Sequence, residues 1–199
     1  KKAASQLEAK VEKELADLQM GATVFHVSFP PDASRQKTFT PTGWDQIEFQ
    51  IAPNPGEPLK PLIKIASGGE MSRIMLALKC IFNDSDPVYT LIFDEIDTGV
   101  SGRAAQAIAE KMAVLARKCQ ILCVTHLPQV ACMADHHYAI SKESDAESTR
   151  TKVEKLTPQG KIFELARMLG GAEVTEKTRE HAAEMIRLAE QIKMKAVHS

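Results

Sequence analysis

The sequence predicts an α/β fold, with a parallel sheet flanked by helices and an antiparallel strand pair beside it. Two observations predict this class. A strand–helix–strand succession runs from residue 88 to residue 124, and its two strands are almost entirely apolar. Farther along, β-prone runs at 138–141 and 151–156 flank a polar turn, which is typical of an antiparallel pair.

Composition narrows the functional classes. The chain has 199 residues, of which 44% are hydrophobic and 26% charged, as in soluble globular proteins. Its formal net charge of −1 carries no overall basic signature for nucleic acid, so any DNA contact has to be local. No apolar run approaches the ~18 residues needed to span a bilayer, and no secretion signal opens the chain. We therefore expect a cytoplasmic location and no membrane contact.

The four cysteines form no C-x-x-C pair, which argues against a zinc site. Cys80, Cys119 and Cys123 lie in or beside apolar stretches, so we interpret them as reduced core residues of a cytosolic protein.

Residues 1–20 predict a charged amphipathic helix, with apolar residues three or four apart at Leu7, Val11, Leu15 and Leu18. Gly21 is expected to stop it. Taken alone, this stretch is a surface helix. Because it begins without a cap signal, it also suggests the end of a longer helical arm.

Residues 24–29 and 47–51 predict two strands that would form a hairpin with a long loop, with turn signals at 30–35 and 41–43 between them. A proline run at 53–61 then keeps the chain extended. It is either a linker or, as we prefer, a loop that positions Ser67.

Ser67 and Glu70 have the spacing of a helix capping box. Between them, Gly68 and Gly69 leave room for close approach to the backbone. A helix N-terminus with free N–H groups is a ready anion site. The helix that follows is expected to bury a face formed by Ile74, Ala77, Leu78 and Ile81.

The apolar run 88–93 predicts a strand that is buried on both faces, as in a parallel sheet. It ends in Asp94 and Glu95, at the strand edge where open α/β sheets bind ligands. One such carboxylate can hold a hard cation such as Mg²⁺, and the other can polarise a water molecule.

A helix beginning at Ser101 or Gly102 leads to a second buried strand at 120–124. Strand, helix and strand in this order predict a parallel, right-handed crossover. Both strands then end at one edge, which should bring His126 close to Asp94 and Glu95. The rest of the predicted elements are helices, at 127–131, 162–169 and 182–192.

The ordered set of motifs resembles the second half of an ABC-type ATPase head. Ser67–Glu70 matches the signature motif, Leu91–Glu95 the Walker B strand, Asp97 the D-loop and His126 the H-loop. The Asp94–Asp97 order favours the SMC-like branch over a transporter head. Within that branch, the stretches 54–58, 67–79, 94–102 and 125–131 are similar to the bacterial RecN family of DNA-repair ATPases.

The resemblance implies a role for the three carboxylates at the strand end and for the histidine after the next strand. Asp94 would be a Mg²⁺ ligand through water, and Glu95 would direct the attacking water. Asp97 would contact the composite site across a head–head interface, and His126 would sense the γ-phosphate or the attacking water.

The resemblance also implies that Ser67, Gly68 and Gly69, with Glu70, bind the nucleotide by cradling the γ-phosphate. Arg73 and Lys79 receive no role, because most charges on a helix only solvate one face.

No G-x-x-x-x-G-K-[ST] phosphate loop occurs in the 199 residues. The family implies that the N-terminal half of the same head supplies it, and that two heads sandwich two ATP molecules. Residues 1–20 would then be the end of a coiled-coil arm, and residues 21–199 the C-terminal lobe of the head. The implied function is ATP hydrolysis in recombination and DNA double-strand-break repair, near the nucleoid.

Two alternatives stay open. One is a head segment of another SMC-like or ABC ATPase. The other is a non-catalytic dimerisation or DNA-scaffold module that has kept the fold.

Overall fold

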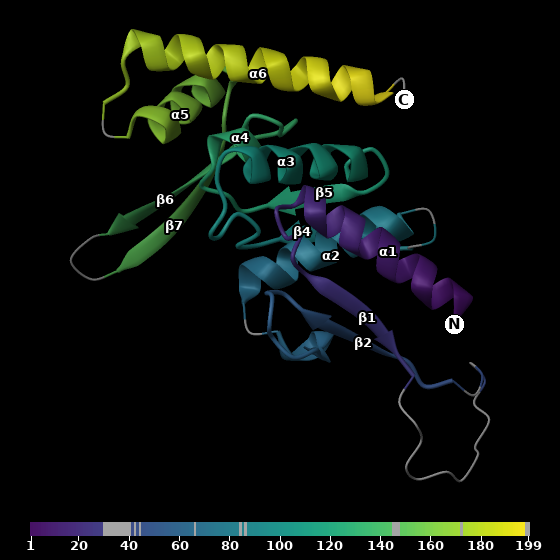
Figure 1. Ribbon diagram of the computed structural model, residues 1–199. Helices are drawn as coiled ribbons and strands as arrows, with labels where there is room; N and C mark the ends of the chain where they lie inside the picture. The colour runs from purple at the N-terminus through teal and green to yellow at the C-terminus, as the bar shows by residue number, and fades with distance from the viewer. Residues whose placement is uncertain are drawn as a thin grey trace. The chain divides into compact units, whose positions relative to one another are not determined.

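A computed structural model describes residues 1–29, 41, 43, 45–65, 67–83, 85, 87–144, 148–171 and 173–197. Figure 1 shows its helices and strands. The chain divides into two compact units. Unit 1 comprises residues 1–87 and 94–98, and unit 2 comprises residues 88–93 and 99–199. Unit 2 holds a parallel strand pair with helices and an antiparallel pair, as the sequence predicts.

Unit 1 contains an antiparallel sheet of order β1-β2-β3. Val24 in β1 is opposite Ala52 in β2, which confirms that the two predicted strands pair. The predicted turn at 30–35 lies outside the described residues. The proline run ends in a short strand and a 3₁₀ turn that lead to the helix α2. The elements are α1 (Lys2–Asp17), β1 (Val24–Ser28), β2 (Glu48–Ala52), β3 (Lys60–Pro61), η1 (Leu62–Lys64) and α2 (Gly68–Phe82).

Helix α1 ends earlier than the sequence predicted. It stops at Asp17, and Gln19, at φ 61°, takes the left-handed position expected for Gly21. The Gln19 N–H donates to the Ala16 carbonyl and the Met20 N–H to the Leu15 carbonyl, which is a Schellman motif. Because these bonds satisfy the last carbonyls, the helix ends without a glycine. The apolar stripe is confirmed, since Val11, Leu15 and Leu18 are fully buried.

Two glutamates of α1 cover the outer edge of β1. Glu8 Oε1 accepts from the Val27 N–H at 2.9 Å, and Glu12 Oε1 accepts from the Phe25 N–H at 3.2 Å. Glu8 also contacts His26 Nδ1 at 2.8 Å. Carboxylates one helical turn apart are spaced like alternate N–H groups of a strand. The helix therefore takes the place of a neighbouring strand at an edge that would otherwise be open.

Unit 2 begins with the predicted strand–helix–strand succession. β4 (Thr90–Phe93) and β5 (Gln120–Cys123) are parallel, with Phe93 opposite Cys123, and α3 (Arg103–Leu115) lies between them in sequence. The Val124 N–H donates to the Phe93 carbonyl at 3.0 Å, so both strands end at one edge. The predicted stripe of α3 is confirmed by the burial of Ala105, Ile108, Met112 and Leu115.

The prediction that β4 is buried on both faces is wrong for this chain. Phe93 is buried, but Ile92 is 71% exposed, and in the paired strand Leu122 is 48% exposed. Burial along β4 alternates, with one side turned inward. In the described residues, unit 2 therefore covers one face of the pair and leaves apolar side chains on the other.

The remaining elements of unit 2 are α4 (Pro128–Ala131), β6 (Tyr138–Ser144), β7 (Thr149–Lys155), α5 (Pro158–Gly170) and α6 (Glu176–Val197). β6 and β7 form the predicted antiparallel pair, with Ile140 opposite Val153. Figure 1 shows this pair extending from the helices of the unit. α5 packs against α6, and the Gly170–Gly171 pair marks the end of α5.

All four cysteines are reduced. Cys132 is buried and the others are half-buried, so only Cys132 is a core residue in the strict sense. Burial raises the pKa of the Cys132 thiol to about 11. In the described part of the chain, no helix combines the length and apolar character that crossing a bilayer requires.

We predict that Glu8→Ala accelerates amide hydrogen exchange at Val27 by about tenfold, because a buried edge N–H loses its acceptor. Glu8→Gln is the matched control, since its amide oxygen can still accept. Equal protection of Val27 in both variants would show that Glu8 does not protect the edge of β1.

Candidate functional site

The N-terminus of α2 is capped as the sequence predicts. Ser67, at φ −89°, is the N-cap, and its Oγ accepts from the Glu70 N–H at 3.4 Å. Ser67 and Gly68 are exposed, whereas Gly69 is buried. Glu70 stands in the first turn, where a carboxylate stabilises the positive end of the helix dipole.

The turn formed by residues 94–98 is hydrogen-bonded to this helix. Ser72 Oγ donates to the Asp94 carbonyl at 2.9 Å. Arg73 Nη1 donates to the Thr98 carbonyl at 3.0 Å and to the Ile96 carbonyl at 3.4 Å. The turn is closed by its own bond from the Thr98 N–H to the Glu95 carbonyl, at 3.0 Å. Unit 1 therefore brings the signature-like segment and the strand-end carboxylates together, although they are more than twenty residues apart.

The contact between α2 and the turn explains in part why Gly68 and Gly69 have no side chain. A Cβ on Gly69 would lie 3.0 Å from the Glu95 carbonyl oxygen and 3.1 Å from the Thr98 Cβ. A Cβ on Gly68 would lie 2.5 Å from Glu95 Oε2. The sequence predicted close approach to this backbone, and in the structure the approaching group is the chain's own turn. The phosphate cradle stays a prediction.

The carboxylates of the turn differ in exposure. Asp94 and Glu95 are exposed, and Asp97 is 3% exposed. Glu95 also has a φ of 58°, in the left-handed region that non-glycine residues rarely occupy. Such a conformation costs about 1–3 kcal/mol and tends to occur at functional sites. No sequence pattern predicts this conformation at a glutamate.

Arg73 is the buried cation of this region, at 8% exposure. Burial lowers the pKa of its guanidinium, and the negative charge of Glu70 partly offsets that effect. Within the described residues, its Nε is buried without a hydrogen-bond acceptor. Sequence reasoning missed both Ser72 and Arg73, because a charged or hydroxyl side chain early in a helix normally faces solvent.

His126 belongs to unit 2, three residues after β5, and is exposed. Thr125 Oγ1 accepts from the Leu127 N–H at 3.0 Å, and Pro128 then opens α4. This bond and the start of α4 at Pro128 define the backbone of the segment after the strand. The expected proximity of His126 to Asp94 and Glu95 stays a prediction, because these residues belong to different units.

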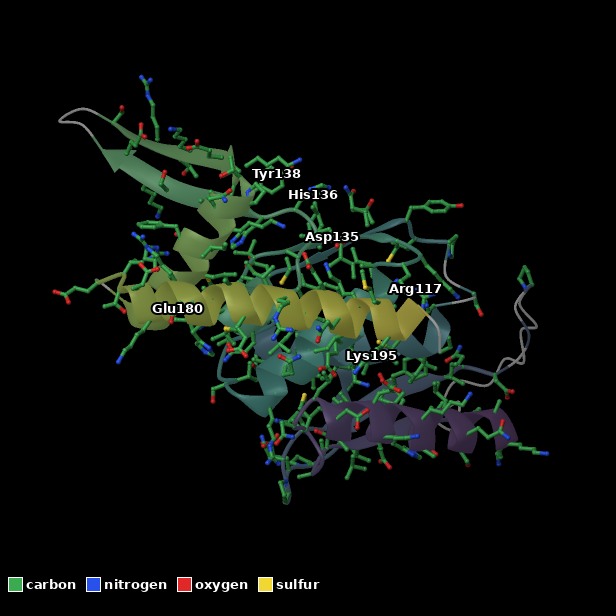
Figure 2. All side chains as sticks on the ribbon, turned by 90° about the horizontal axis from the view of Figure 1, so that it is seen from above. Arg117, Asp135, His136, Tyr138, Glu180 and Lys195 are labelled. Carbon is green, nitrogen blue, oxygen red and sulfur yellow. The ribbon has the colours of Figure 1, made fainter. Side chains whose placement is uncertain are left out.

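A hollow of about 370 Å³ lies in unit 2, and none of the predicted site residues lines it. At its wall, Lys161 Nζ donates to the carbonyls of Asp135, at 2.7 Å, and Ala134, at 3.2 Å. Lys193 Nζ pairs with Asp135 Oδ1 at 2.7 Å. Figure 2 shows Asp135 and His136 side by side where the chain approaches β6. Since these charges bond to one another and to backbone, they tie α5 and α6 to the segment after α4.

No family model matches the chain. Curated proteins do match it. The chain is 50% identical over 193 residues to a protein of Halalkalibacterium halodurans named DNA repair protein RecN. The matched region covers 97% of this chain and 34% of that relative. Its identity to the protein of the same name from Bacillus subtilis is 46% over 201 residues, covering 96% of this chain and 35% of the relative.

The chain belongs to the RecN family. It is also 42% identical over 195 residues to the RecN protein of Streptomyces coelicolor, covering 94% of this chain and 34% of that relative. The chain thus spans about a third of the length of these RecN proteins, and it matches their C-terminal part.

Solved structures show the fold of this RecN-family chain. An Smc head domain with a coiled coil and joint, from Pyrococcus yayanosii, superimposes with a TM-score of 0.57 at 17% identity. That match covers 85% of this chain and 29% of the other. An Smc head domain with an extended coiled coil, from Pyrococcus furiosus, matches with a TM-score of 0.50 at 16% identity over 76% of this chain and 35% of the other. The predicted SMC-type head fold is therefore confirmed.

We predict that Gly69→Ala in this RecN-family chain destabilises unit 1 by about 1–3 kcal/mol, since backbone and Cβ atoms of the turn would have to move. The free energy of urea unfolding measures the effect. Gly21→Ala is the control, because its Cβ would meet nothing closer than 3.7 Å. If the two variants unfold alike, the turn does not pack on α2 as described.

Proposed function

We propose that the intact protein hydrolyses ATP between two associated heads, and that it acts in DNA double-strand-break repair and recombination. In this proposal the chain supplies the signature motif, the Walker B strand, the D-loop and the H-loop. The order of these motifs and the name of the curated relatives support the proposal. It also places the protein in the cytoplasm, associated with the nucleoid.

One observation carries the proposal. The exposed, capped N-terminus of α2 and the carboxylate-bearing turn at 94–98 form a single hydrogen-bonded piece of unit 1. A helix N-terminus favours anions, while carboxylates favour cations and water. Two nucleotides with Mg²⁺, one in each of two heads, would offer both kinds of partner: the carboxylates would serve one nucleotide and the helix N-terminus the other.

We assign Asp94 to the Mg²⁺ ion, through water. In the described residues, no group of three or more His, Cys, Asp or Glu side chains could hold a metal ion. Phosphate oxygens and water would therefore supply most of the ligands, as is usual for Mg²⁺ in phosphoryl-transfer sites. When bound, ATP and Mg²⁺ supply the phosphoryl group and neutralise its charge. The exposed carboxylate of Asp94 fits this requirement.

We assign Glu95 to the attacking water, which it orients or deprotonates. Its exposed carboxylate and its left-handed backbone support a functional role. His126 is assigned to contact with the γ-phosphate or with the same water. A histidine suits this task because its imidazole can either donate or accept a hydrogen bond.

The remaining groups are assigned to the nucleotide of the opposite head. Ser67, Gly68 and Gly69 would cradle its γ-phosphate with a hydroxyl and backbone N–H groups, next to Glu70 in the first turn of α2. Asp97 would act across the same interface. Because only ATP carries the γ-phosphate, this contact would favour closed heads before hydrolysis and open heads after it.

The chain lacks a phosphate-binding loop, so we propose that the N-terminal half of the same head completes the site. The apolar face of the β4–β5 pair, formed by Ile92, Leu122 and Val124, supports this proposal. These side chains are 71%, 48% and 51% exposed. Strands that are apolar on both faces belong to sheets covered on both faces. The covering half would come from the remaining length that this chain's relatives possess.

We predict that Glu95→Gln in the intact protein keeps ATP binding and ATP-dependent association of heads but lowers turnover by about 10²- to 10⁴-fold, the range for loss of a general base. Steady-state phosphate release and nucleotide titration measure the two effects. Glu57→Gln is the control, since Glu57 is an exposed carboxylate outside the turn. Unchanged hydrolysis would rule out this role for Glu95 and would favour the non-catalytic scaffold.

We predict that this chain alone turns over no ATP, and that activity appears when it is produced together with the N-terminal half of the head. Changing Ile92 and Val124 together to Ser should weaken the complex, because apolar area would no longer be buried. Changing Leu188 and Met194 to Ser on α6 is the matched control. ATP turnover by the chain alone would contradict the proposed partner. So would an equal loss of complex formation in both double variants.

A further inference from the structure

Arg73 is placed where it can hold the turn at 94–98. It lies in the second turn of α2, and its Nη1 bonds to two carbonyls of that turn. Ser72, the preceding residue, bonds to a third carbonyl, that of Asp94. The three accepting carbonyls flank Glu95 and Asp97, whose side chains carry the proposed chemistry.

Burial of this cation calls for an explanation. Removing a charge from water is unfavourable, and an apolar residue of similar volume often packs at lower cost. In the part of the chain that the structure describes, Arg73 donates its hydrogen bonds to the backbone carbonyls of Ile96 and Thr98. A buried guanidinium in that arrangement contributes most by fixing the position of the backbone to which it donates.

We infer that Arg73 is a positioning residue for ATP hydrolysis, which fixes the turn at 94–98 and thereby the placement of Glu95 and Asp97. The inference rests on the proposed function. Arg73 touches neither the water nor the phosphate in this account, since it acts through the carbonyls of Ile96 and Thr98. A water-directing carboxylate tolerates little displacement, and a shift of about 1 Å can reduce the rate by about 10²-fold.

The planar guanidinium suits this task better than an ammonium. Its donors have a fixed direction, so two carbonyls of one turn are held in one orientation. A lysine has a compact charge on a flexible stem and holds its acceptors less firmly. The kcat of Arg73→Lys should therefore lie between that of the native protein and that of Arg73→Met, whose side chain has no donor.

The test compares Arg73→Met and Arg73→Lys in the intact protein. We expect kcat for ATP hydrolysis to fall about 10- to 100-fold in Arg73→Met, with KM within about twofold, because positioning affects the reacting geometry more than binding. Amide hydrogen exchange should become faster in residues 94–99. Ile74→Val is the matched control. Ile74 is fully buried on the same helix, so its loss of stability should leave kcat unchanged.

Ser72→Ala is a second variant that keeps the buried core intact. It removes only the bond to the Asp94 carbonyl, so we expect a smaller loss of kcat and faster exchange in the same turn. If Arg73→Met does not fold, Arg73→Lys and Ser72→Ala decide the matter by the same two measurements.

The inference would be overturned if the Arg73 and Ser72 variants kept the native kcat. It would also be overturned if their amide hydrogen exchange in the turn were no faster than in Ile74→Val. Native kcat in Arg73→Met together with an inactive Glu95→Gln would refute only the positioning role. Full turnover in Glu95→Gln would instead refute the proposed function on which it rests.

Discussion

The structure of the candidate site depends on hydrogen bonds from one helix to the carbonyls of one turn. Ser72 and Arg73, early in α2, donate to the turn at 94–98 at distances between 2.9 and 3.4 Å. Because Gly69 has no side chain, the turn can lie directly on the helix. The capped N-terminus of α2 and a pair of exposed carboxylates are thus held in one piece. Neither group alone would be specific, since helix caps and strand-end carboxylates occur in many proteins.

The two strand pairs near this piece in sequence differ in how far their exposed groups are covered. In unit 1, α1 covers the open edge of β1 with two carboxylates, so that the backbone groups of that edge are paired. In unit 2, the β4–β5 pair keeps an apolar face exposed, including Ile92 at 71%. In the described residues, the polar edge of β1 is therefore closed by the chain itself, whereas the apolar face of the β4–β5 pair is not covered. This contrast is expected if the missing layer comes from another part of the same head.

Much of this architecture could be predicted from the sequence, because periodicity sets local structure. The stripes of α1 and α3, the N-cap at Ser67 and the parallel pairing of β4 with β5 all follow from spacing and residue type. Three features could not be predicted. Gln19 ends α1 through a Schellman motif, Glu95 adopts a left-handed backbone, and Arg73 turns inward. The Schellman motif is local, but its sequence has no glycine to mark it. The conformations of Glu95 and Arg73 accompany contacts between α2 and the turn at 94–98, which a local pattern does not encode. The wrong prediction of burial for β4 has a similar origin, since apolar character does not show whether a covering layer is present.

The central claim is the proposal that the segment at Ser67–Glu70 and the carboxylate of Glu95 serve nucleotides in different heads. Mixing two inactive forms of the intact protein, one with Ser67→Arg and one with Glu95→Gln, tests it most directly. In a mixed dimer, one site would combine the native Glu95 of the first form with the native Ser67 of the second. Turnover should then recover to about a quarter of the native rate in an equal mixture, because about half of the dimers are mixed and each has one intact site. No recovery despite formation of mixed dimers would contradict the account.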